Sequence, residues 1–148
     1  MTPDSPISVR FGDRILERGF TAIPNLVLDT YSQLGISESE MLFIIHVWQY
    51  WWNEKNPYPS LSAIAQKMGT TRRTTRRHVE SLKRKGLLIV RERVGSGIGK
   101  MTNEYDFSPL IEAVVTHTSP HRTFLSYALG TELSDGHRTG LSSEEEQG

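Results

Sequence analysis

The sequence contains no cysteine, which excludes disulfide bonds and thiolate metal sites. It also lacks a long hydrophobic run: the longest apolar stretch, 41–52, is interrupted by His46, Gln49 and Tyr50 and cannot span a bilayer. The first residues have neither the basic start nor the apolar segment of a signal peptide. These absences predict a cytoplasmic protein without a membrane partner.

Net charge of one sign is absent too, because the formal net charge of the 148 residues is zero. The average conceals an uneven distribution. Residues 61–100 contain eleven basic and two acidic side chains, a net charge of +9, and the rest of the chain carries the opposite charge. A solvated helix face usually interleaves acids with bases, whereas here acids are nearly missing. The segment therefore predicts a positive surface that attracts phosphates.

The length and the hydrophobic fraction of 36% predict one domain with some of the chain outside its core. Residues 1–18 are polar and rich in turn formers, which predicts a flexible N-terminal arm. Residues 19–115 contain the periodic segments and form the predicted domain. Residues 116–148 are polar, end in Ser-Ser-Glu-Glu-Glu-Gln-Gly, and predict a disordered tail.

The first part of the predicted domain begins with an alternating segment, 19–25, which is typical of a short edge strand. A helix of one or two turns is expected within 26–34. Ser37 and Glu40 then have the spacing of a capping box, which opens a helix whose apolar residues recur every three or four positions as far as Trp52.

Two more helices follow, separated by a short turn. Ser60 is expected to cap the first of them, and Gly69 to end it in a left-handed conformation. Thr71 is expected to cap the second, which runs to Lys85 and stops at Gly86.

Strands are predicted over 87–93 and 102–107, with a flexible hairpin tip between them and a short closing helix at 109–115. Two helices joined by a glycine-containing turn form a helix-turn-helix, and the hairpin that follows is a wing. The predicted fold is therefore mostly α with a small antiparallel β wing, a winged helix-turn-helix.

In this arrangement the second helix of the pair enters the major groove of DNA through its N-terminal half. That half, 71–78, contains four arginines, whose guanidinium groups can bridge two guanine acceptors or clamp a phosphate. Base contacts are predicted for Arg73, Thr74 and Arg77. The predicted contacts to the DNA backbone are Ser60, Ser62, Lys67, Thr71, Arg72, Arg76, Lys83 and Arg84, and those of the wing are Arg91, Arg93 and Lys100.

The run 69–79, followed by Leu82 and by Lys85-Gly86-Leu87-Leu88, resembles the winged-helix domains of bacterial and phage replication-initiator-like proteins. Segments 20–25 and 103–107 resemble the opening strand and the last wing strand of those domains. The resemblance covers about 19–112 and implies DNA binding in replication initiation. It departs at Thr75, where the family usually has valine or isoleucine, so the hydroxyl there needs a helix carbonyl as partner.

Three other signals are weaker than they look. The glycine-rich run 95–100 lacks the flanking residues of a Walker loop and lies between two predicted strands, which favours a wing tip. Trp48, Trp51 and Trp52 have the spacing of a core stripe, although a platform for stacking single-stranded bases, or one Trp at a self-association surface, stays open. His117, His121 and His137 fit a solvated tail better than a metal site.

No nucleophile with a base, no paired carboxylates and no cofactor fingerprint are recognisable, so we expect no enzyme, metal or cofactor. The predicted function is sequence-specific binding of double-stranded DNA, in replication initiation or transcriptional regulation of a bacterial mobile element or phage. A homodimer and replication or transcription proteins are further candidate partners. The alternatives are a protein–protein adaptor with a basic docking face and an initiator whose remaining part lies on another chain.

Overall fold

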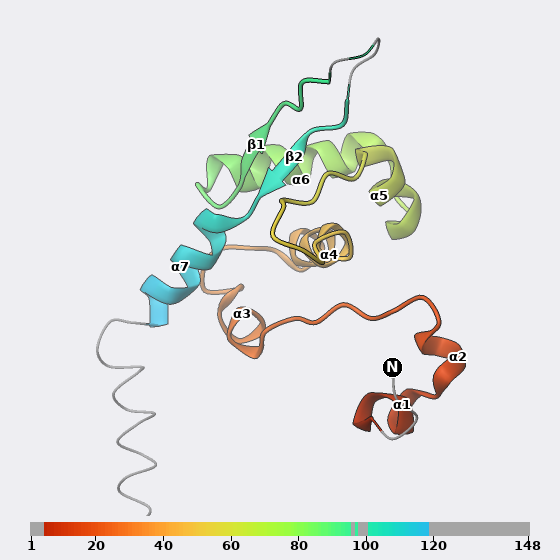
Figure 1. Cartoon of the computed structure of the whole chain (residues 1–148). Helices are drawn as coiled ribbons and strands as arrows, with labels where there is room; N and C mark the ends of the chain where they lie inside the picture. Colours follow the sequence, from red (N-terminus) through yellow and green to blue (C-terminus); the bar gives the residue numbers. More distant parts are fainter. Residues whose placement is uncertain (1–4, 96, 98–100, 119–148) are drawn as a thin grey trace, which may run out of the picture.

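The computed structural model describes residues 5–95, 97 and 101–118, and it has the predicted fold: a mostly helical winged helix-turn-helix with one small antiparallel sheet (Figure 1). None of the helices in these residues is long and apolar enough to cross a membrane. The elements in chain order are α1 (Pro6–Phe11), α2 (Asp13–Leu16), α3 (Asn25–Thr30), α4 (Glu38–Trp48), α5 (Leu61–Met68), α6 (Arg72–Arg84), β1 (Ile89–Arg91), β2 (Glu104–Asp106) and α7 (Ser108–Thr118).

The central helix α4 begins with the predicted capping box. The Ser37 hydroxyl accepts from the Glu40 N–H at 3.1 Å, and the Glu40 carboxylate accepts from the Ser37 N–H at 2.8 Å. The helix ends at Trp48, four residues before the predicted end at Trp52. After Trp48 the helical ladder gives way to tight turns, in which the N–H groups of Tyr50 and Trp51 donate to carbonyls three residues back. Further on, the Pro57 carbonyl accepts a hydrogen bond from the Tyr105 N–H of β2, at 2.9 Å.

The helix-turn-helix pair forms with the predicted caps. Ser60 and Thr71 each accept a hydrogen bond from a backbone N–H in the first turn of α5 and α6. Gly69 ends α5 with φ +67°, a left-handed conformation that costs glycine nothing. Thr75 is fully buried, and its hydroxyl donates to the Arg72 carbonyl at 2.8 Å, which supplies the partner that the sequence required.

The wing strands pair antiparallel, with Ile89 opposite Asp106 and Arg91 opposite Glu104. Both are shorter than predicted: β1 begins later because Leu87 and Leu88 turn into the core, and β2 is limited to the three residues that pair with β1. Residues 96 and 98–100 of the predicted tip lie outside the described residues.

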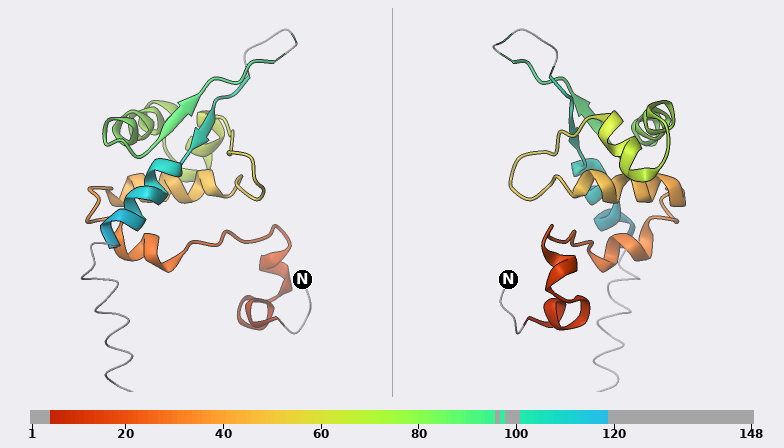
Figure 2. Two further views of the ribbon diagram at one scale, coloured as in Figure 1. Left: turned by 60° about the vertical axis from the view of Figure 1, so that its left-hand side comes forward. Right: turned by 90° about the vertical axis from the view of Figure 1, so that its right-hand side faces the viewer.

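The N-terminal part differs most from the prediction. Residues 19–24 form no strand, because no other segment of the described chain pairs with them. Two short helices, α1 and α2, occupy part of the predicted arm, and the Ser5 hydroxyl caps α1. Figures 1 and 2 show both helices apart from the body that α4, α5 and α6 form. The predicted flexibility of this arm stays a prediction.

The helix α7 is longer than the predicted 109–115, and it runs three residues into the predicted tail. It packs against α3. The rest of the tail, including His121 and His137, lies outside the described residues. His117 belongs to α7, where its Nε2 lies 2.5 Å from the Gln33 side-chain oxygen. No group of metal-ligating side chains is found within the described residues.

A single core lies between α4, the inner side of α6, the wing and α7. Its most buried large side chains include Phe43, Ile64, Leu82 and Phe107, all at most 1% exposed. The Trp48 ring meets the Phe107 ring edge-on, with centroids 5.9 Å apart. Because this core fixes one side of α6, the opposite side of the helix faces solvent.

Candidate nucleic-acid interface

The N-terminal half of α6 presents four arginines to solvent: Arg72, Arg73, Arg76 and Arg77 are all exposed. Their direction follows from the helix repeat, since Thr75, Val79 and Leu82 are buried on the other side. None of the four makes an ion pair with another residue of the described chain. The four guanidinium groups are therefore available to an external anion.

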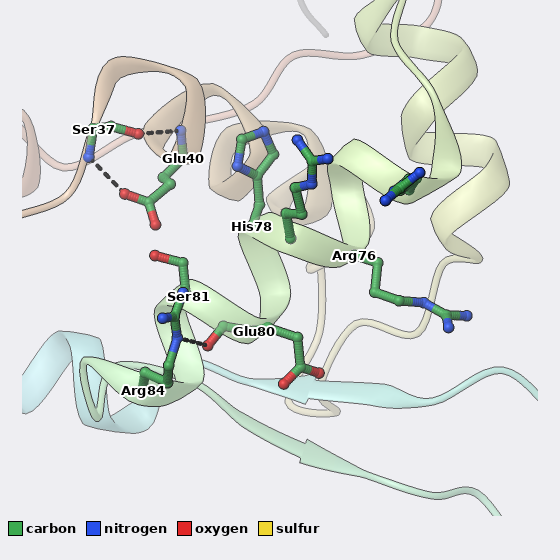
Figure 3. A pocket seen from close by; sticks show the side chains of 9 residues that line it. Ser37, Glu40, Arg76, His78, Glu80, Ser81 and Arg84 are labelled. Carbon is green, nitrogen blue, oxygen red and sulfur yellow. Dashed lines mark hydrogen bonds between the residues drawn. The ribbon is translucent and has the colours of Figure 1, made fainter.

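Two hollows flank α6. One lies on the side of α4, lined by Arg73, Arg77 and Arg84 together with Glu40 and His78 (Figure 3). In that view the Arg76 side chain extends away from Glu40. Burial lowers the pKa of His78 below its ordinary value of 6.5, more than the nearby Glu40 charge raises it, so His78 is neutral at pH 7. The positive charge on this flank therefore comes from arginine.

The second hollow, of about 400 Å³, lies between α6 and the wing. Arg72, Arg76 and Lys83 line it from the helix, and Asn103 and Tyr105 line it from the hairpin. Burial raises the pKa of Tyr105, against a smaller opposite effect of Arg72, so the phenol stays neutral. The hollow therefore holds three cations and one carboxylate, Glu80, on the helix side, opposite neutral polar side chains of the wing.

The predicted base-contact residue Thr74 is half-buried, unlike Arg73 and Arg77. Its hydroxyl lies 3.1 Å from the Thr71 hydroxyl, within the cap of α6. The predicted backbone-contact residue Ser60 is likewise occupied as the cap of α5, whereas Ser62 is exposed.

The lysine and arginine side chains that are predicted to contact the DNA backbone differ in the contacts they make within the chain. Lys83 lies 3.6 Å from Glu80 in an exposed pair, and Arg84 donates through Nε to the Glu80 carbonyl at 3.4 Å. Lys67 donates to the Gln49 side-chain oxygen at 3.2 Å and lies over the Tyr50 ring. An exposed ion pair such as that of Lys83 with Glu80 contributes little to stability, so Lys83 can exchange Glu80 for another anion at low cost.

The wing arginines are held more firmly. Arg91 forms an ion pair with Asp106 at 2.5 Å, and Arg93 stacks over Tyr58 at 3.8 Å from the ring centroid. The Ser108 hydroxyl and then Arg91 donate hydrogen bonds that lower the pKa of Asp106, against the opposite effect of burial. The Arg91 ion pair joins the two strands of the wing, and the Arg93 contact attaches the wing to the segment before α5, roles that the sequence analysis missed. Lys100 lies outside the described residues.

The register of the hairpin was the signal that could have identified the Arg91 contact. Asp106 lies two residues beyond Glu104, the residue opposite Arg91, and residues two apart in a strand share a face.

The model of the family described as "DnaD N-terminal domain" matches residues 23–123 of the chain. Among solved structures, the crystal structure of the N-terminal domain of DnaD protein from Geobacillus kaustophilus HTA426 superposes with a TM-score of 0.56 at 23% identity, covering 80% of this chain and 94% of that one. The crystal structure of transcriptional regulator PA3341 gives a TM-score of 0.41 at 18% identity, covering 80% and 88%. No curated protein matches the chain.

Proposed function

This chain belongs to the DnaD N-terminal domain family, and from that premise we propose that it binds double-stranded DNA through α6 in the initiation of replication. The family assignment supports a DNA-related role, and the sequence-level resemblance to replication-initiator-like winged helices agrees with it. A setting in transcriptional regulation, on a bacterial mobile element or phage, belongs to the same proposal. The role requires no catalysis and no cofactor.

One observation supports the proposal most directly: the arginines at the start of α6 are exposed and unpaired in the described chain. Glu80 lies in the same hollows but pairs with Lys83, and no carboxylate of the described chain forms an ion pair with these arginines. A helix about 10–12 Å across fits the major groove, and its N-terminal residues reach the base edges first.

The proposed division of labour follows from position on the helix. Arg73 and Arg77 are one turn apart on the outermost face and read base edges, with Thr74 beside them at the cap. Arg72 and Arg76 line the hollow between α6 and the wing, and they contact the phosphates of one DNA strand. Phosphate contacts position the helix and base contacts select the sequence.

The test is duplex binding measured over a salt series, with pairs of variants. Arg72→Ala with Arg76→Ala removes two phosphate contacts, so the slope of log K against log salt becomes shallower by about two. Arg73→Ala with Arg77→Ala weakens binding to a selected site by at least about tenfold and relaxes its sequence preference.

The matched control is Arg10→Ala with Arg14→Ala, which removes the same charge from exposed positions of α1 and α2. If the control lowers duplex affinity as much as the α6 pairs do, general charge explains the binding and the proposed groove contact is wrong. If the Arg73 and Arg77 pair keeps full duplex affinity and loses a protein partner, the adaptor function replaces DNA binding.

A single copy of such a domain buries little surface on DNA and binds specific sites weakly. We therefore propose that specific recognition requires two copies, as a homodimer or on repeated DNA sites. Footprints on one half-site and on two correctly spaced half-sites distinguish these cases from binding by one copy.

A further inference from the structure

A third hollow, of about 500 Å³, lies away from the wing, where the chain after α2, the end of α4 and the end of α5 come together. Arg18, His46, Gln49, Tyr50, Trp52 and Lys67 line it. Lys67, in the last turn of α5, is the lining residue nearest to α6 in the sequence. The proposed duplex contacts of Arg72, Arg73, Arg76 and Arg77 do not use its aromatic side chains.

Trp52 is the unexplained member of this group. Trp48 is buried, and Trp51 packs on it with ring centroids 5.9 Å apart. Trp52, in contrast, is 77% exposed, although its neighbour in sequence is half-buried. An indole exposed to this extent contributes little to folding and leaves a large flat apolar face in water, next to the polar lining of this hollow.

The charges around the indole indicate the occupant. The lining contains two permanent cations, Arg18 and Lys67, and no carboxylate. Lys67 is already oriented, with its ammonium 4.7 Å from the Tyr50 ring centroid and 3.2 Å from the Gln49 oxygen. A ligand that suits this surface has a flat π face for Trp52 and a negative group for the cations.

We propose that this hollow is a single-stranded nucleic-acid site, in which one unpaired base stacks on Trp52 and its phosphates lie against Arg18 and Lys67. Stacking on an aromatic side chain beside a positive groove is how proteins hold single strands without reading their sequence. None of the residues that line this hollow belongs to α6. The inference therefore stands whether or not α6 reads a duplex.

The experiment measures binding of a fluorescein-labelled oligothymidylate of about 12 nucleotides, because thymidylate forms no duplex. Trp52→Ala lowers its affinity by at least about fivefold, the smallest loss expected for one stacked base. Trp52→Phe restores most of that loss because it keeps a π face. The oligonucleotide also quenches the tryptophan emission of the wild-type chain, and in Trp52→Ala this quenching is largely lost.

A double-stranded probe separates this site from α6. Trp52→Ala leaves duplex affinity within about twofold, and the Arg73 and Arg77 double variant leaves single-strand affinity within the same limit. The proposal is overturned if the wild type does not bind oligothymidylate at low salt, or if Trp52→Ala binds it as the wild type does. It is also overturned if Trp52→Ala weakens both probes equally, or if poly-glutamate binds with the same dependence on Trp52, which would make the hollow an acidic-peptide site.

Discussion

Replacing Lys85 with methionine should strongly destabilise this domain. The Lys85 ammonium lies 2.7 Å from a carboxylate oxygen of Glu40 and 2.6 Å from the Gly35 carbonyl. Glu40 is only 4% exposed, so its carboxylate is largely removed from water. The variant therefore leaves a buried negative charge without its counter-ion.

The pKa of Glu40 gives the magnitude. Burial alone raises this pKa, but the hydrogen bonds from Lys85, from the Ser81 side chain and from the capping box outweigh burial and lower it from 4.5 to about 2. A difference of this size between folded and unfolded chain corresponds to about 3 kcal/mol at neutral pH. Since the Lys85 side chain is one-third exposed, water relieves part of the loss. We expect Lys85→Met to lower the free energy of unfolding by about 2–3 kcal/mol.

Urea denaturation at pH 7 measures this difference, and Lys83→Met provides the control on the same helix. Lys83 pairs with Glu80 at 3.6 Å, and both side chains are about half exposed, so its removal costs less than about 0.5 kcal/mol. Equal losses in the two variants would refute the argument, because burial of the Glu40 charge would then have no effect.

The same ion pair sets a pH dependence whose sign is fixed. The pKa of Glu40 is lower in the folded chain, so its contribution to stability is complete above about pH 4.5 and is lost as the pH falls toward 2. Glu40→Gln keeps the capping-box hydrogen bond and removes the charge. The free energy of unfolding of Glu40→Gln should change less over this pH range than that of the wild type. Parallel curves of this free energy against pH for the two proteins would contradict the role assigned to Glu40.

Three further changes test other parts of the fold. Thr75→Val should alter the free energy of unfolding by less than about 1 kcal/mol, because the new side chain has the same shape and the Arg72 carbonyl stays in the helix ladder; a loss above about 2 kcal/mol in urea would contradict this. Gly69→Ala should cost about 1–2 kcal/mol by the same measurement, from φ +67° alone, since the added Cβ meets nothing within 4 Å. Ile15→Ser, which removes an apolar side chain that is 68% exposed on α2, should weaken any self-association seen by analytical ultracentrifugation, and an unchanged dissociation constant would exclude α2 from the contact.

The sequence predicted those parts of the fold that depend on neighbouring residues. Caps, the left-handed Gly69 and the buried side of α6 all follow from spacings of three or four residues, so their positions were right. The segment 19–25 was predicted wrongly, because a strand needs a partner and alternation alone does not supply one. The contact of Lys85 with Glu40 joins residues 45 apart in the sequence, and no local pattern indicates it.

The long-range contacts also change how the basic charge of the segment must be counted. Of its cations, Lys85 and Arg91 form ion pairs with the buried carboxylates of Glu40 and Asp106. Arg93 lies over the ring of Tyr58. Those charges hold the fold together and are not released to phosphates without loss of stability. The cations left free for DNA are mainly those on α6, of which Arg73 and Arg77 are assigned to bases. If so, about four phosphate contacts remain, and the salt slope should lie near −4. A slope near −9 would mean that Lys85 and the wing arginines Arg91 and Arg93 leave their partners within the chain and contact phosphates when DNA binds.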